Sequence, residues 1–61
     1  MRSMRLLNAA LVHNDMGLDF VSDDRLEEAI AEFEQALNLH PGLESARRNL
    51  AAAQTARSKK R

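Results

Sequence analysis

The chain has 61 residues, enough for one small domain, and its nine basic and nine acidic side chains balance to a formal net charge of zero. It contains no cysteine, which excludes disulfides and thiolate zinc sites as a source of stability. No stretch approaches the roughly 20 apolar residues of a transmembrane segment. We expect a cytoplasmic protein that is stabilised by helix packing or by association with another chain.

Composition favours an all-α fold, because alanine, leucine, glutamate and arginine dominate and all four are strong helix formers. With two glycines, one proline and few β-branched residues, little material is left for strands. The first helix is expected to begin after Ser3, a favourable N-cap residue, and to run to about Val21 or Ser22. The polar run Ser22-Asp23-Asp24 then ends it, since short polar side chains compete for backbone hydrogen bonds.

The second helix is expected to begin at Arg25, because Asp24 and Glu27 have the spacing of a capping box. Apolar residues then recur every three or four positions, which places them on one helix face. They are Leu26, Ala29, Ile30, Phe33, Ala36, Leu37 and Leu39. His40-Pro41-Gly42 ends this helix, because the residue before a proline avoids helical geometry.

A third helix is expected from about Leu43 to Ala56. Its apolar positions are Leu43, Ala46, Leu50 and Ala51 or Ala53. Short connections between consecutive helices make neighbours antiparallel, so the predicted fold is three antiparallel helices.

Eight residues of the first two helices fit a sparse motif in a fixed register. They are His13, Met16, Gly17, Phe20, Ala29, Phe33, Ala36 and Pro41. Gly17 and Ala29 are small enough for two helix backbones to approach closely, and Phe20 and Phe33 fill the space between them. The pattern resembles the tetratricopeptide repeat, a helix–turn–helix of about 34 residues. It departs from the family at His13, where a large aromatic is usual, and at Asp24, where the turn usually has glycine.

The resemblance implies one complete repeat followed by a lone helix of the kind that caps such arrays. We therefore divide the chain into an N-terminal extension of the first helix (1–9), the repeat (10–43), a capping helix (44–57) and a disordered basic tail (58–61). About three repeats are normally needed for a stable array, so the resemblance alone does not predict a stable monomer.

In this family, ligands lie in a concave groove lined by the first helix of each repeat. The corresponding positions are Leu11, Asn14, Leu18, Val21 and Ser22 in the first helix, and Ser45, Arg48, Asn49, Ala52 and Thr55 in the third. Asn14 and Leu18 replace the lysine and asparagine of the family's carboxylate clamp, so we do not expect that mode of peptide binding.

An apolar stripe runs along the first helix with the 4-3-4-3 spacing of a coiled coil. It comprises Leu7, Leu11, Asn14, Leu18 and Val21. The repeat motif occupies another face of this helix, so two of its faces must pack against other surfaces. The second helix packs on one of them. The stripe packs against the third helix, a second copy of the chain or another protein. With Arg48 and Ala52, the stripe forms the predicted partner-binding surface, and we expect a homo-oligomer.

The sequence shows no nucleophile-and-base arrangement, no phosphate-binding loop, and no expected metal or cofactor site, so we predict a non-enzymatic protein-binding scaffold. The alternative is an accessory factor whose basic end, residues 57–61, touches RNA or an anionic membrane surface. Nucleic acid is the weaker expectation, because the chain has no Tyr or Trp to stack on bases. Its acidic middle and basic ends can also steer one copy onto another.

Overall fold

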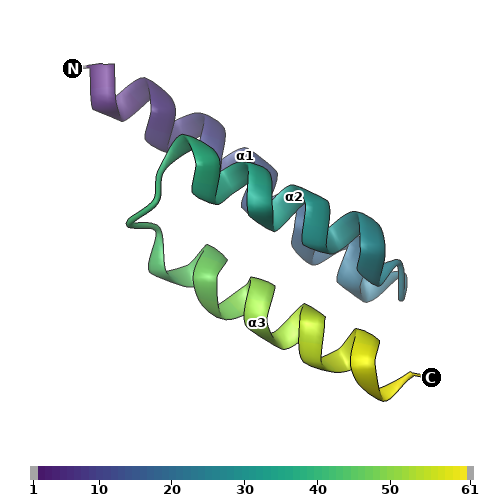
Figure 1. The fold of residues 1–61 in the computed structure, drawn as a ribbon. Helices are drawn as coiled ribbons and strands as arrows, with labels where there is room; N and C mark the ends of the chain where they lie inside the picture. The colour runs from purple at the N-terminus through teal and green to yellow at the C-terminus, as the bar shows by residue number, and fades with distance from the viewer. Residues whose placement is uncertain (1, 61) are drawn as a thin grey trace.

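The computed structural model describes residues 2–60 and the side chains of residues 4–60. This part of the chain forms three helices and no strand: α1 (Arg2–Ser22), α2 (Leu26–Leu39) and α3 (Glu44–Lys59). The all-α class and the three antiparallel helices are confirmed. α2 lies between the other two and runs antiparallel to both, while the first turns of α1 project beyond the end of α2 (Figure 1).

The turn between α1 and α2 corrects the predicted capping box. The amide of Arg25 donates to the carbonyl of Phe20 at 2.8 Å, and that of Asp24 donates to the carbonyl of Val21 at 2.9 Å. Asp24 has a left-handed backbone with φ of 63°. This is a Schellman motif, which closes the C-terminus of α1. Asp24 is therefore committed to ending α1, and the N-cap position of α2 falls to Arg25, which makes no side-chain capping bond.

The turn between α2 and α3 is the one that proline predicts. His40 leaves the helical region, with φ of −148° and ψ of 87°, as the residue before a proline should. The amide of Leu43 donates to the carbonyl of His40 at 3.1 Å, which closes a four-residue turn with Pro41 at its second position.

The helix ends differ from the sequence expectation at two places. α1 begins at Arg2, so Ser3 is helical and does not precede the helix. α3 continues through Lys59, into the segment 58–61 that we expected to be disordered. Arg61 lies outside the described residues. No helix breaker interrupts the last turn of α3, and its basic side chains interact favourably with the negative end of the helix dipole.

The core consists of two clusters, both built on α2. One contains Ala29, Ile30, Phe33 and Ala53, with Phe20 and Leu50 packed against it. The other contains Ala10, Ala36 and Ala46, with Leu37, Leu39 and Leu43 packed against it. Each cluster joins α2 to both neighbours, so α2 organises the whole molecule.

Gly17 and Phe33 set the close approach of α1 and α2. A Cβ atom built on Gly17 would fall 2.6 Å from Cδ1 of Phe33, closer than real Cβ contacts allow. The Phe33 side chain is fully buried, so its ring cannot move aside easily. Of the other motif residues, Ala29 and Ala36 are buried, His13 and Phe20 are half-buried, and Met16 and Pro41 are exposed.

A candidate protein-binding groove

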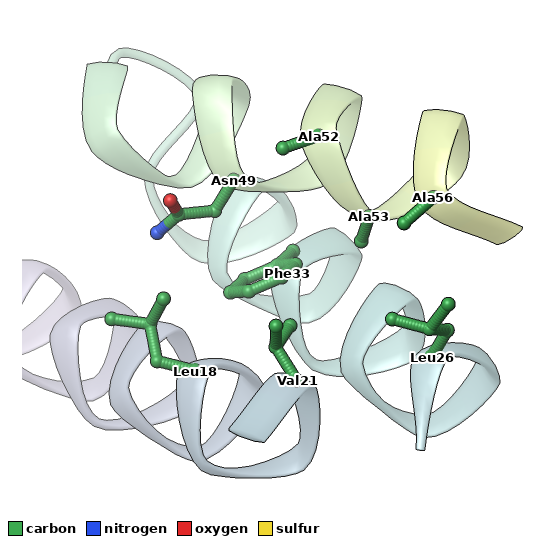
Figure 2. A pocket seen from close by; sticks show the side chains of 8 residues that line it. All are labelled: Leu18, Val21, Leu26, Phe33, Asn49, Ala52, Ala53 and Ala56. Carbon is green, nitrogen blue, oxygen red and sulfur yellow. The ribbon is translucent and has the colours of Figure 1, made fainter. Parts of the chain in front are cut away.

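An apolar groove opens between the C-terminal half of α1 and the facing side of α3. It has a volume of about 260 Å³. Its lining comprises Leu18 and Val21 from α1, Leu26 and Phe33 from α2, and Asn49, Ala52, Ala53 and Ala56 from α3 (Figure 2). Asn49 is the polar member of this lining; the other side chains are aliphatic or aromatic.

The groove exists because the side chains that α3 directs toward α1 are small. Ala52 and Ala56 are too short to reach across to α1, Ala53 packs on α2, and the ring of Phe33 lies between the side chains of α1 and α3 (Figure 2). As a result, Leu18 remains 43% exposed and Val21 39% exposed. Large apolar side chains beside a concave surface are the usual signature of a binding site.

Asn14 ties α1 to α3 beyond the open part of the groove. Its side chain is 6% exposed. The amide nitrogen donates to Oγ of Ser45 at 3.2 Å, and the amide oxygen accepts from Nδ2 of Asn49 at 3.0 Å. No buried side-chain polar atom in the described part of the chain lacks a partner. Asn14 is therefore satisfied inside one chain, where α3 covers the centre of the apolar stripe.

The structure separates the sequence-predicted binding residues into three groups. Leu18, Val21 and Ala52 come together in the groove. Asn14 is buried against α3, as described above. Leu7 is half-buried, and Leu11 and Arg48 are exposed, but none of the three lines the groove. Sequence reasoning assigned Phe33 to the core alone and did not foresee that its ring also borders the groove.

Two ion pairs connect the last turns of α3 to the α1–α2 turn and the start of α2. Nη1 of Arg57 lies 3.1 Å from Oε1 of Glu27, and Nζ of Lys60 pairs with the carboxylate of Asp24. All four side chains are largely exposed, so each pair contributes at most about 1 kcal/mol. They nevertheless direct two cations of the basic end toward carboxylates of the same chain.

Polar contacts and one cation–π contact also reinforce the α1–α2 hairpin. Nδ1 of His13 lies 2.7 Å from Oε1 of Glu32. The guanidinium of Arg25 lies 4.9 Å from the ring centroid of Phe20 and donates two hydrogen bonds to Glu28, at 2.9 and 2.5 Å. These hydrogen bonds lower the pKa of Glu28 and raise the pKa of Arg25. The hairpin is thus held at its turn and near its middle, whereas α1 and α3 leave the groove between them open.

Comparison with known proteins finds a curated relative that is similar over most of this chain. The chain is 43% identical over 44 residues, 72% of its length, to the tetratricopeptide repeat domain-containing protein PYG7, chloroplastic, of Arabidopsis thaliana. The matched segment covers 15% of that relative. No protein-family model matches the chain, and no solved structure matches it significantly. Among residues 2–60, no helix has the length and apolar character needed to cross a membrane.

Proposed function

The chain contains a tetratricopeptide-like repeat, and from this premise we propose that it is a non-enzymatic protein-interaction module that binds its partner in the α1–α3 groove. The observation that carries the proposal is the exposure of Leu18 and Val21 beside a concave apolar surface. The PYG7 relative is named for its tetratricopeptide repeat domain, which supports protein binding as the general role. A cytoplasmic location stays a prediction.

The occupant that fits this groove is an amphipathic segment of another protein. The lining favours apolar side chains, since alanines leave space and Asn49 is its one polar member. Arg48 is exposed and lies one helical turn before Ala52, on the same side of α3. We therefore propose a segment that places apolar side chains against Leu18 and Val21 and a carboxylate near Arg48.

Selection of peptides from a random display library against the folded chain would test this proposal. Selected peptides are expected to shift the NMR signals of the Leu18 and Val21 methyl groups and to combine apolar with acidic residues. Leu18→Asp should abolish their binding. Val12→Asp is the matched control, because it places the same charge at an exposed apolar position on another face of α1. Peptides that bind equally to Leu18→Asp would contradict the proposal, and so would failure to select any peptide.

The sequence also predicts self-association through the apolar stripe. In this structure only part of the stripe is accessible to a second copy. A second copy could reach the Leu18 and Val21 end of the stripe, but α3 covers Asn14 at its centre. Light scattering of Leu18→Asp tests this version, which requires that the substitution give monomers.

The RNA or membrane alternative depends on the basic end of the chain. Because Arg57 and Lys60 already face Glu27 and Asp24, this end is less available to an external anion than the sequence suggests. Binding to single-stranded RNA or to anionic vesicles that persists near 0.2 M salt would favour the alternative, since a contact through a few cations is strongly salt-dependent.

A further inference from the structure

A second face of α1 has apolar side chains between two charged ones, and no other helix of the described residues 2–60 packs on its exposed centre. Arg5, Ala9, Val12, Met16 and Asp19 follow one another with 4-3-4-3 spacing, which keeps them on one side of a helix. We call this the back face. Val12 is 56% exposed and Met16 is 39% exposed. Val12 lies roughly a third of a turn around α1 from Leu18, so the back face is separate from the groove.

The packing of α3 on α2 shows how a face of this kind binds another helix. α3 packs on α2 through Leu43, Ala46, Leu50 and Ala53. The residues 34 positions earlier are Ala9, Val12, Met16 and Asp19 of the back face. α1 therefore exposes positions that correspond to those by which α3 is docked against a helix. This correspondence indicates that the back face is suited to packing against another helix.

Charges at the two ends of the back face identify the helix that fits. Arg5 lies seven residues before Val12, and Asp19 lies seven residues after it. If two copies of α1 pack antiparallel about Val12, Arg5 of each copy faces Asp19 of the other. A parallel pair would instead place Arg5 against Arg5 and Asp19 against Asp19. The charges thus favour an antiparallel, two-fold contact, the form that a symmetric dimer requires.

We propose that a second copy of this chain binds the back face, with the two α1 helices antiparallel around a two-fold axis at Val12. Met16 of each copy then packs near Asn8 and Ala9 of the other, and the two Arg5–Asp19 pairs close the ends of the contact. The groove, on another side of α1, stays open in both copies. This dimer goes beyond the proposed function, because it uses a different surface and does not require a groove ligand.

Light scattering of the full chain across a concentration series, from micromolar to millimolar, tests the dimer. Twice the chain mass is expected at high concentration. The contact is limited to one helix face per copy and is smaller than a standard interface, so the dimer should dissociate on dilution. Val12→Asp should give monomers that retain their helicity, and Leu18→Asp should leave the dimer intact.

If Val12→Asp fails to fold, exchanging the charges at Arg5 and Asp19 provides a second test of the dimer. Arg5→Asp or Asp19→Arg alone converts two attractive pairs into two repulsive ones and should weaken the dimer about tenfold. The double variant Arg5→Asp/Asp19→Arg restores opposite charges and should recover the dissociation constant. A wild-type monomer at every concentration would overturn the proposal. So would a double variant as weak as the singles, or a dimer that is lost in Leu18→Asp and kept in Val12→Asp.

Discussion

α1 meets its two neighbours in opposite ways. Against α2 it is closed: Gly17 admits the ring of Phe33, the His13–Glu32 contact joins the middles of the two helices, and Arg25 lies over Phe20 at the turn. Against α3 it is tied at Asn14 and then opens into the groove. The difference shows how a small helical protein can be stable and still expose apolar surface. One interface is filled by a large side chain, while the other is held by hydrogen bonds and left unfilled.

The largest expected effect comes from Phe33, the residue that belongs to both regions. Phe33→Ala removes the side chain that fills the α1–α2 interface and borders the groove. A buried Phe→Ala change costs about 3–5 kcal/mol. This is comparable to the total stability of roughly 3–9 kcal/mol that about 0.05–0.15 kcal/mol per residue gives for 61 residues. We expect a largely unfolded chain by far-UV circular dichroism.

Leu18→Ala is the control for this prediction, because it truncates a groove side chain that is already partly exposed. It should remain folded and lose about 1 kcal/mol in urea unfolding, less than full burial of a leucine contributes. Equal losses in Phe33→Ala and Leu18→Ala would show that the two regions do not differ as described.

Asn14→Ala should weaken the contact between α1 and α3, the less closely packed of the two interfaces. It removes both hydrogen bonds that join α1 to α3 at this point. The expected loss is about 1–2 kcal/mol, because Ser45 and Asn49 lie near enough to the surface to be hydrated once their partner is gone. Amide hydrogen exchange should accelerate in α3 and change less in α2. Unchanged protection in α3 would show that Asn14 does not anchor it.

The closed region was the more predictable of the two. The spacing of Gly17, Ala29 and Phe33 indicates which helix faces meet, because motif and packing are short-range features of a single hairpin. His40-Pro41 likewise ends α2 for a local steric reason. These elements follow from residues that lie close together in the chain.

The open region and the first turn depend on contacts that spacing does not reveal. The stripe shows that Asn14 faces away from α2, but which chain covers it depends on the path of α3. Asp24 suits an N-cap and also tolerates a left-handed backbone, so its role is decided by where α1 ends. The extension of α3 past residue 57 accompanies ion pairs to Glu27 and Asp24, which lie at least 30 residues away in sequence.

Gly17→Ala tests how tightly the closed interface is packed. The added methyl group overlaps the buried ring of Phe33. Overpacking costs about 1–3 kcal/mol, against about 1 kcal/mol gained when alanine replaces glycine inside a helix. We expect a net loss of about 1 kcal/mol in urea unfolding. Gly42→Ala is the matched control, since its φ is not positive and its nearest atom, Nε2 of His40, is 3.9 Å away. A Gly17→Ala variant as stable as Gly42→Ala would mean that the helices can separate without cost.

The smallest effect is expected at Asp24, whose backbone closes α1 and whose side chain pairs with the end of α3. Asp24→Gly relieves the left-handed backbone that closes α1 but removes the ion pair with Lys60, the residue that follows α3. Aspartate tolerates this backbone better than most residues, so the gain is about 0.5–1 kcal/mol, while an exposed pair contributes a few tenths. Urea unfolding should therefore show a small net stabilisation. Lys60→Ala measures the pair alone and should cost little. Equal destabilisation of the protein by Asp24→Gly and Lys60→Ala is the contrary outcome. The ion pair to the turn would then contribute more than the relief of the left-handed backbone at Asp24, and the end of α3 would be held more firmly than the open groove implies.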